Sequence, residues 1–419
     1  MDRTTSVRRR GVSPPGAAAR VFAPLADSPG FRALWGSSLL FFSGFWGQSV
    51  VLAWLAFELT ASPFAVAAFT AVSFAPLLLG PFGGALSDRT DRVRLLIASQ
   101  AIALADAAVI AVLAMMGLVE YWHVVVAGFV LGAMQAPLQP ARFTLLMDLV
   151  GRDGLSKANA LSTAAMMGAR IVAPAAAGWM IGALGVSAAL WFSAAWYLPS
   201  LYWAARLREL PGRSMAAGGT VLAEILDGVR VAVRRREIAG VLLVSIAANA
   251  LAWPILQAFL PIFAEEVLRS GAAGLGLLFA VNACGSLAGA LGIAALGDVR
   301  AKGPIFLAGT AAFGLLLCAF ALSGGMPVAL TLILLAGIAS AGFGVMQSTI
   351  LLLLAPDEVR GRVMGVLMLS IGVMPFATLA QGAVASAAGV IPTTIVSGAL
   401  LAASVGAVAL AIPGLRRSG

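Results

Sequence analysis

The chain has 419 residues, of which 61% are hydrophobic and only 11% charged, and its formal net charge is +9. Soluble proteins average about 45–50% apolar and 25% charged residues, so this composition excludes an ordinary soluble domain and indicates a polytopic membrane protein. There is one histidine, and the two cysteines, Cys284 and Cys318, both lie inside apolar segments. We therefore expect no disulfide framework, no metal site and no cofactor.

The first 30 residues are rich in arginine, proline and alanine, and they contain no apolar stretch long enough for a signal peptide. We interpret residues 1–30 as a disordered cytoplasmic arm. From Phe31 onward, apolar segments of about 20 residues recur, which is the length that a helix needs to cross a ~30 Å hydrocarbon core. The sequence predicts twelve transmembrane helices, at 31–57, 64–86, 93–117, 122–149, 157–183, 187–206, 238–264, 271–296, 303–323, 327–355, 362–387 and 390–412.

The basic residues divide the connections between these helices into two kinds. Every lysine and arginine except Arg170 and Arg269 lies in the N-terminal arm, in the C-terminal tail, or at or near every second connection. Because short cytoplasmic connections hold the excess of lysine and arginine, we expect both termini to be cytoplasmic and the protein to lie in the cytoplasmic (inner) membrane. Topology then explains the positive charge, and we expect no nucleic-acid partner.

The connection at 207–237 is the longest, and it separates two predicted six-helix halves at 31–206 and 238–412, which a tail at 413–419 follows. Apolar residues recur in this linker at helical spacing, which predicts an amphipathic helix on the cytoplasmic face. The halves are weakly self-similar, since Gly-Ala-Met-Gln and Gly-Val-Met-Gln recur half a chain apart. The predicted fold class is therefore an all-α membrane protein with two pseudo-symmetric six-helix halves.

Between the second and third predicted helices, residues 84–94 read G-A-L-S-D-R-T-D-R-V-R. An ionised side chain at the bilayer centre costs roughly 2.5–3.5 kcal/mol or more, so this charged stretch must be a loop outside the hydrocarbon. It resembles the signature loop between helices 2 and 3 of the major facilitator superfamily, and the matching residues are Gly84, Asp88, Arg89, Arg92 and Arg94. Asp91 stands where the family usually has a second glycine.

Other segments resemble one branch of that superfamily, which includes enterobactin exporters and drug and macrolide exporters. Among them are Phe31-Arg32-Ala33-Leu34-Trp35 and Asp357-Glu358-Val359-Arg360-Gly361-Arg362-Val363. The resemblance covers nearly the whole chain from residue 31. It implies the major facilitator fold and the export of small molecules.

The resemblance also implies two contacts that form only when the halves close on the cytoplasmic side. Asp88 would meet the start of helix 11 near Gly361, where a helix N-terminus stabilises a carboxylate, and Arg92 would meet Asp148. In helix 5, Pro174 and its small neighbours resemble an exporter signature in which Ala173 replaces a glycine. These small residues would allow close packing on helix 8 as a seal.

By resemblance, helices 1, 4, 7 and 10 line a central cavity. Counting ~1.5 Å per residue from the membrane edge places six of their polar or aromatic residues at middle depth, namely Trp46, Gln48, Gln135, Asn249, Trp253 and Gln347. Aromatic and amide groups without a fixed charge suit a bulky, amphipathic, uncharged or weakly charged ligand. The alternative is that the tryptophans only pack and the amides only bridge helices.

Asp106 is the only acid deep in a predicted helix, and Arg170 is the only deep base. Each lies about 13 residues from the cytoplasmic side, so the two share a depth of roughly 20 Å. In one interpretation Asp106 carries a coupling proton, with Glu58, Glu265 and Glu266 at the outer helix ends as the next candidates. In the other, which we favour because helix 3 is normally peripheral, Asp106 and Arg170 form a fixed ion pair.

These features predict a secondary active, proton-coupled exporter, an antiporter that works by alternating access as a monomer. Its substrates would be amphipathic small molecules such as drugs, macrolides or siderophore-like compounds. The alternatives are a facilitator or importer of a small metabolite, and a receptor or scaffold that kept the fold but lost transport. An enzyme is disfavoured, because the helices contain no Ser-His-Asp set, metal-ligand set or paired carboxylates.

Overall fold

The computed structural model describes residues 24–79, 90–209, 235–296, 301–355 and 360–417, and within these ranges the chain forms helices and no strands. The first helix group comprises α2 (Pro29–Glu58), α3 (Pro63–Phe74), the 3₁₀ helix η1 (Ala75–Leu79), α5 (Arg92–Met115), α6 (Tyr121–Leu184), α7 (Val186–Ala205) and the 3₁₀ helix η2 (Arg206–Glu209). The backbone of α6 breaks at Gly151, whose φ is 66°, so α6 consists of two arms, Tyr121–Gly151 and Lys157–Leu184.

The second helix group begins with α9 (Arg236–Leu251), whose span continues through the π-helix η3 (Ile255–Phe259), α10 (Leu260–Ile262) and the π-helix η4 (Phe263–Val267). Pro261 has no N–H to donate to the carbonyl of Gln257, which accounts for irregular winding at this place. The remaining helices are α11 (Gly271–Ala295), α12 (Lys302–Ala321), α13 (Met326–Leu354), α14 (Arg360–Ile371), α15 (Met374–Ala388), α16 (Val390–Ala411) and α17 (Pro413–Arg417).

Ten helices of the described chain are long and apolar enough to cross a membrane: Pro29–Glu58, Arg92–Met115, Tyr121–Gly151, Lys157–Leu184, Arg236–Val267, Gly271–Ala295, Lys302–Ala321, Met326–Leu354, Val363–Ala388 and Val390–Ala411. Each lies within a few residues of a predicted span. The other two predicted spans correspond to the shorter helix Pro63–Leu78 and to α7.

Several predicted features fall wholly or partly outside the described residues. Residues 210–234, which make up most of the predicted linker, lie outside the described ranges. The loop residues Gly84, Asp88 and Arg89 also lie outside them. Of the predicted disordered arm, residues 24–27 form a helical turn and α2 already begins at Pro29. The predicted tail contains the short helix α17.

Polar side chains cap the starts of three helices. Ser28 Oγ accepts a hydrogen bond from the Phe31 amide at 3.1 Å, and Ser62 caps α3 in the same way. Asp91 Oδ1 accepts from the amides of Val93 and Arg94 at 2.9 and 3.1 Å. Asp91, which departs from the family's loop pattern, is therefore the N-cap residue of α5. Aspartate is among the residues preferred at that position.

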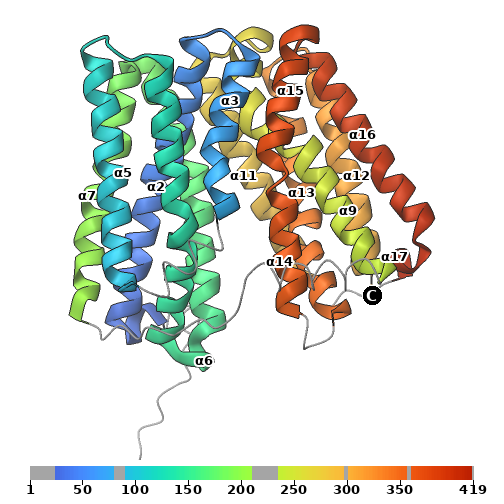
Figure 1. The fold of residues 1–419 in the computed structure, drawn as a ribbon, viewed down its shortest axis with the longest axis horizontal. Coiled ribbons are helices and arrows are strands. Elements are labelled where there is room, and N and C mark those ends of the chain that lie inside the picture. The colour runs from blue at the N-terminus through green and yellow to red at the C-terminus, as the bar shows by residue number, and fades with distance from the viewer. Residues whose placement is uncertain (1–23, 80–89, 210–234, 297–300, 356–359, 418–419) are drawn as a thin grey trace, which may run out of the picture.

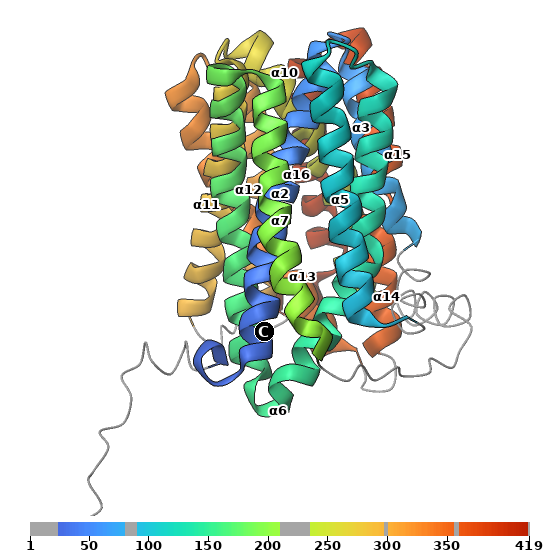
Figure 2. The ribbon, with the colours of Figure 1, turned by 90° about the vertical axis from the view of Figure 1, so that its left-hand side faces the viewer.

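The two helix groups lie side by side, as the blue-to-green and orange-to-red ribbons of Figure 1 show. We call the end of the bundle where α17 lies the lower end, and the opposite end the upper end (Figure 1). Within the first group, α5 and α7 pack on each other and α7 packs on α2, so that α5 and α7 stand in front of α2 in Figure 2. The main contacts between the groups are α6 with α11 and α3 with α15.

Two of the contacts between the groups lie toward the upper end. In α3, the amide of Phe64 donates a hydrogen bond of 3.0 Å to Ser386 Oγ of α15. In the other contact, Gly178 of α6 meets Gly276 of α11 so closely that a Cβ on Gly276 would collide with the carbonyl oxygen of Pro174. The close approach expected near Pro174 is thus present, and it is made by backbone against backbone.

Candidate functional site

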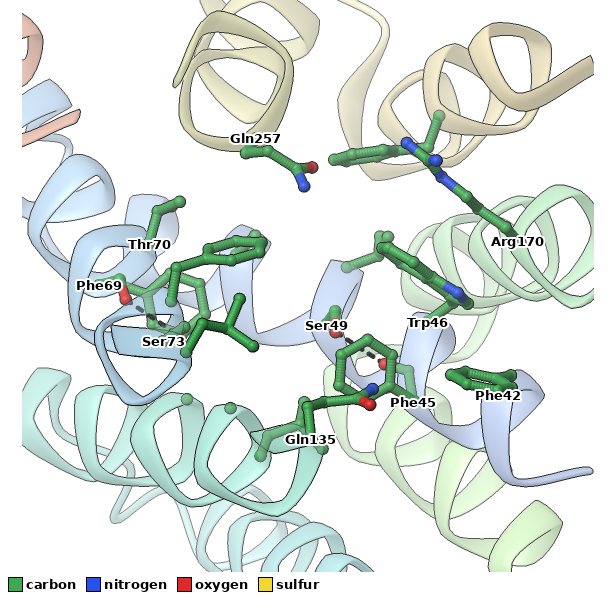
Figure 3. A pocket seen from close by; sticks show the side chains of 18 of the residues that line it. Phe42, Phe45, Trp46, Ser49, Phe69, Thr70, Ser73, Gln135, Arg170 and Gln257 are labelled. Carbon is green, nitrogen blue, oxygen red and sulfur yellow. Dashed lines mark hydrogen bonds between the residues drawn. The ribbon is translucent and has the colours of Figure 1, made fainter. Parts of the chain in front are cut away.

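A cavity of about 320 Å³ lies between the helix groups (Figure 3). Most of its wall belongs to α2, α3, η1 and the two arms of α6, while Gln257 of η3 and Phe279 of α11 close it from the second group. The lining is mainly aromatic and aliphatic, with Phe42, Phe45, Trp46, Phe69, Phe74, Leu77, Leu131, Met166 and Met167 among its members.

The polar groups of this cavity differ in whether the protein satisfies them. Ser49, Thr70 and Ser73 each donate their hydroxyl to a carbonyl of their own helix, at 2.7, 2.9 and 2.8 Å. Gln135 and Gln257 face the cavity from opposite sides in Figure 3, and the buried Gln135 Oε1 has no hydrogen-bond partner in the described chain. The amides therefore keep hydrogen-bonding capacity that the described chain does not use, whereas the hydroxyls are already bonded.

Arg170 projects from the second arm of α6 to the cavity wall beside Trp46 (Figure 3). Its guanidinium lies over the Trp46 ring, 5.1 Å from the centroid, a cation–π contact. The cavity thus contains a fixed positive charge. This corrects the expectation of a cavity without fixed charge, which followed from considering the residues of helices 1, 4, 7 and 10 alone.

Of the six residues predicted for a substrate cavity, Trp46 and Gln135 line this cavity, whereas Gln48 does not. Gln48 is buried on the other side of α2, where its Nε2 donates to Asp106 and its Oε1 accepts from Tyr197. The reason is helical geometry, since residues two positions apart are rotated by about 200° around the axis. Trp46 and Gln48 share a depth but face opposite directions.

The three residues predicted from the second half do not line this cavity. Asn249 Nδ2 donates to the carbonyl of Ser245 at 2.9 Å within α9, and Gln347 Oε1 lies 3.0 Å from Ser245 Oγ, which joins α13 to α9. The Trp253 ring packs edge-on against Phe313 of α12, with centroids 6.1 Å apart. In this structure Gln347 bridges two helices, Asn249 bonds within its own helix and Trp253 packs on a neighbouring ring, contacts of the kind that the packing alternative describes.

Asp106 and Arg170 do not form the expected ion pair. Asp106 Oδ2 accepts a hydrogen bond of 2.7 Å from the side-chain amide of Gln48, and the Tyr197 hydroxyl donates to the oxygen of that amide at 2.9 Å. These two bonds link α5, α2 and α7. Among the described side chains, Arg92 forms an ion pair with Asp148, and Arg94 with Asp91. Asp106 contacts the face of α2 that carries Gln48, and Arg170 contacts the face that carries Trp46. The two charged side chains therefore lie on opposite sides of α2.

Arg142, in the first arm of α6, is a second cation near the cavity. Its side chain is 7% exposed, and its guanidinium lies over the rings of Phe41 and Phe42, at 4.6 and 4.5 Å from their centroids. None of its three side-chain nitrogens has a hydrogen-bond partner in the described chain. Phe42 also lines the cavity, so this charge lies directly behind the cavity wall.

The residues implied as conformational latches are only partly described. Arg92 Nη1 and Asp148 Oδ2 form an ion pair at 3.1 Å, with Arg92 4% and Asp148 47% exposed. Both belong to the first helix group, so this contact needs no closure of the groups, in contrast to the expectation. Arg94 pairs with Asp91 at 3.8 Å, and Gly361 lies in the first turn of α14 with its contacts undescribed.

Sequence reasoning missed Gln257 and the position of Arg170 in the cavity. Gln257 is an amide in an apolar run between Pro254 and Pro261, and polar residues in a proline-interrupted span are a signal for irregular backbone that lines a cavity. Arg170 was recognised by its charge, but depth alone did not give its direction.

Residues 19–416 match the family model described as transmembrane secretion effector, MFS_3. The multidrug efflux pump Tap of Mycolicibacterium fortuitum is 27% identical over 328 residues, which cover 76% of this chain and 80% of Tap. The uncharacterized MFS-type transporter y4rN of Sinorhizobium fredii is 32% identical over 150 residues, which cover 35% of this chain and 36% of y4rN.

Solved transporter structures share the fold at low identity. A POT family transporter in complex with 5-aminolevulinic acid superposes with a TM-score of 0.77 at 11% identity, over 93% of this chain and 97% of that one. The nucleoside transporter NupG gives a TM-score of 0.70 at 14% identity, over 92% and 98% of the two chains. Because the family model matches nearly the whole chain, the protein belongs to the transmembrane secretion effector family of multi-pass, major facilitator-type transporters.

Proposed function

We propose that the protein is a secondary active exporter of amphipathic small molecules that works by alternating access in the cytoplasmic membrane. The ten apolar spans, the helix starting at Pro63 and α7 then make twelve crossings in two six-helix halves. An even number of crossings puts both termini on one side, and the distribution of basic residues favours the cytoplasm for that side.

The cavity between the helix groups is the observation that carries this proposal. Its volume of about 320 Å³ falls at the lower end of the usual range for small-molecule sites, about 300–1,000 Å³. Its apolar wall with a few unbonded amides suits a ligand that is mostly apolar and has a small number of polar atoms. The name of the relative Tap, a multidrug efflux pump, favours export over import.

Alternating access requires the contact between α6 and α11 to close and separate in turn. Gly276→Ala tests this requirement, because the new Cβ would collide with the carbonyl oxygen of Pro174 and destabilise the closed contact. Overpacking of this kind costs about 1–3 kcal/mol, which would shift the balance between conformations by about 5- to 150-fold. The matched control is Gly292→Ala in the same helix, where a Cβ meets nothing within 4 Å.

The measurement is the efflux of a fluorescent amphipathic dye from cells that are first energised and then treated with an uncoupler. We expect the wild type and Gly292→Ala to export the dye until the gradient collapses, and Gly276→Ala to export it at least about fivefold more slowly. Equal export by both variants would contradict the requirement that the contact between α6 and α11 closes during transport. Greater dye accumulation in energised cells that contain the protein would instead support the facilitator or importer alternative.

We also propose that Asp106 carries the coupling proton. An ionised acid within a membrane span is costly unless a partner neutralises it, and no described basic side chain is paired with Asp106. Binding a proton removes this cost, so the acid can exist in two states as the transporter changes conformation. The hydrogen bonds through Gln48 to Tyr197 connect Asp106 to α2 and α7, and α2 also lines the cavity.

Asp106→Asn tests the coupling role, because it keeps the size of the side chain and an oxygen for the Gln48 hydrogen bond but cannot titrate. Uphill export should be lost, while exchange or downhill flux of the dye continues. Adding Arg170→Gln should not restore uphill export, because Asp106 and Arg170 share no described contact and their effects should be independent. Restored uphill export in the double variant would end the coupling role.

A further inference from the structure

The cavity contains one cation and no acid among its described lining residues. Arg170 stacks on Trp46, but no described residue accepts a hydrogen bond from its guanidinium and no described acid is paired with it. The deep acid of the first group, Asp106, is bonded to Gln48 on the other side of α2. An ionised arginine in a membrane span normally has a partner, and this one has only the cavity in front of it.

Arg142 adds a second positive charge behind the same wall. Its guanidinium contacts the ring of Phe42, a cavity residue, and none of its nitrogens has a hydrogen-bond partner in the described chain. Charges of one sign around a low-dielectric cavity reinforce one another and attract the opposite sign. Both cations nearest to the cavity therefore favour an anion within it.

The rest of the wall defines what else the ligand contains. Aromatic rings from α2, α3 and α11 surround the space, and they suit an aromatic or otherwise apolar body. Gln135 and Gln257 lie on opposite sides of it with their amides directed inward (Figure 3). Because an amide both donates and accepts hydrogen bonds, these two residues can bind further polar atoms of a ligand.

We propose that the cavity selects amphipathic anions, in which a carboxylate or sulfonate binds the guanidinium of Arg170 beside Trp46 and an apolar body occupies the aromatic part. This inference rests on the proposed function of the cavity as the substrate site, and it assigns Arg170 as the residue that determines charge preference. Guanidinium groups bind carboxylate-like anions through two parallel hydrogen bonds, which gives orientation as well as affinity.

Two fluorophores with the same aromatic body provide the test: anilinonaphthalenesulfonate, and phenylnaphthylamine, which lacks only the sulfonate. Their binding is measured by fluorescence titration of the purified full-length protein in lipid nanodiscs, with protein-free nanodiscs subtracted. We expect Arg170→Gln to weaken sulfonate binding by about tenfold to a hundredfold, as the loss of a charge-assisted hydrogen bond does, and to change binding of the neutral compound by less than about twofold.

Arg206→Gln is the matched control, because Arg206 also stacks on aromatic rings, those of Tyr202 and Trp203, but lies outside the cavity. It should leave both affinities unchanged. Arg170→Lys keeps the charge but not the two parallel hydrogen bonds, so it should retain part of the preference for the sulfonate and bind it more tightly than Arg170→Gln does. This partial retention distinguishes the loss of the charge from misfolding. Equal weakening of both compounds by Arg170→Gln, unchanged sulfonate binding, or no binding of the sulfonate by the wild type would each overturn the proposal.

The titration uses no gradient, so its result is separate from the test of export. A protein that binds the sulfonate through Arg170 but exports nothing would contradict the proposed function alone. A protein that exports dyes uphill but shows no Arg170-dependent preference for the sulfonate would contradict this inference alone.

Discussion

The two sides of α2 carry polar groups that the protein treats differently. Toward α5 and α7, Gln48 bonds to Asp106 and Tyr197, and Ser37 bonds to Gln100 and Ser200, so each set contains one residue from each of the three helices. Toward the cavity, the hydroxyls of Ser49, Thr70 and Ser73 are bonded within their own helices. The larger polar side chains there, Gln135, Arg170 and Gln257, have no hydrogen-bond partner among the described residues.

This difference distinguishes packing from binding. Polar groups buried in a membrane span are costly unless they are hydrogen-bonded, so the satisfied sets fix how α2, α5 and α7 pack. The unsatisfied set is tolerated only where water or a ligand can reach it. The comparison therefore assigns the bonded sets toward α5 and α7 to packing, with Asp106 as the proposed proton carrier among them, and the cavity side to ligand binding.

Gln48→Leu should produce the largest effect on stability. It leaves the Asp106 carboxylate and the Tyr197 hydroxyl without their partner, and we expect a loss of about 3 kcal/mol in the free energy of unfolding, since unsatisfied buried groups cost about 1–3 kcal/mol each. The measurement is the unfolding of detergent-solubilised protein by heat and by denaturant.

The same exchange on the cavity side is the control for Gln48→Leu. Gln135→Leu removes an amide whose buried oxygen has no partner, so it should be neutral or slightly stabilising while it impairs transport. A loss of stability as large as that of Gln48→Leu would remove the distinction between the two sides.

The two tryptophans predicted as cavity residues should now behave differently. Trp46→Ala removes a cavity wall and the ring under Arg170, so it should change the order of preference among substrates, by several-fold to about tenfold for those that depend on Arg170. Trp253→Ala removes an edge-on contact with Phe313 worth about 0.5–1.5 kcal/mol beyond area burial. It should lower transport of all substrates alike, as competition assays with a panel of dyes would measure.

The positions of the helices could be predicted from the sequence because hydrocarbon thickness dictates the length of an apolar span. The ends of the helices were predicted less accurately, because they depend on local contacts such as the hydrogen bonds of the Asp91 cap. The helical turn before Pro29 was not predicted either. The winding of the span around Gln257 was not predicted, because proline positions show where a helix is disturbed but not which irregular helix results.

The direction of each side chain around its helix was the part that sequence counting could not give. Depth follows from ~1.5 Å per residue, but the direction depends on how neighbouring helices are rotated and packed. Gln48 and Trp46 have nearly equal depth and opposite surroundings. Asp106 and Arg170 were matched by depth, yet α2 lies between their contacts, and only tertiary packing determines that.

Ser200→Ala should have the smallest effect, and it tests whether the second bonded set toward α5 and α7 also serves packing. Ser200 Oγ lies 2.8 Å from Gln100 Oε1 and 2.8 Å from the Ser37 carbonyl, all of them neutral groups, so removing it should cost about 1 kcal/mol of unfolding free energy. Ser193→Ala is the control in the same helix, because Ser193 donates its hydroxyl to its own backbone at Ala189 and should be nearly silent. Transport per folded molecule should be unchanged in both variants when dye efflux is normalised to the amount of correctly inserted protein. A selective loss of transport in Ser200→Ala, without a loss of stability, would place this set in the transport cycle and not in the packing of α2 against α5 and α7.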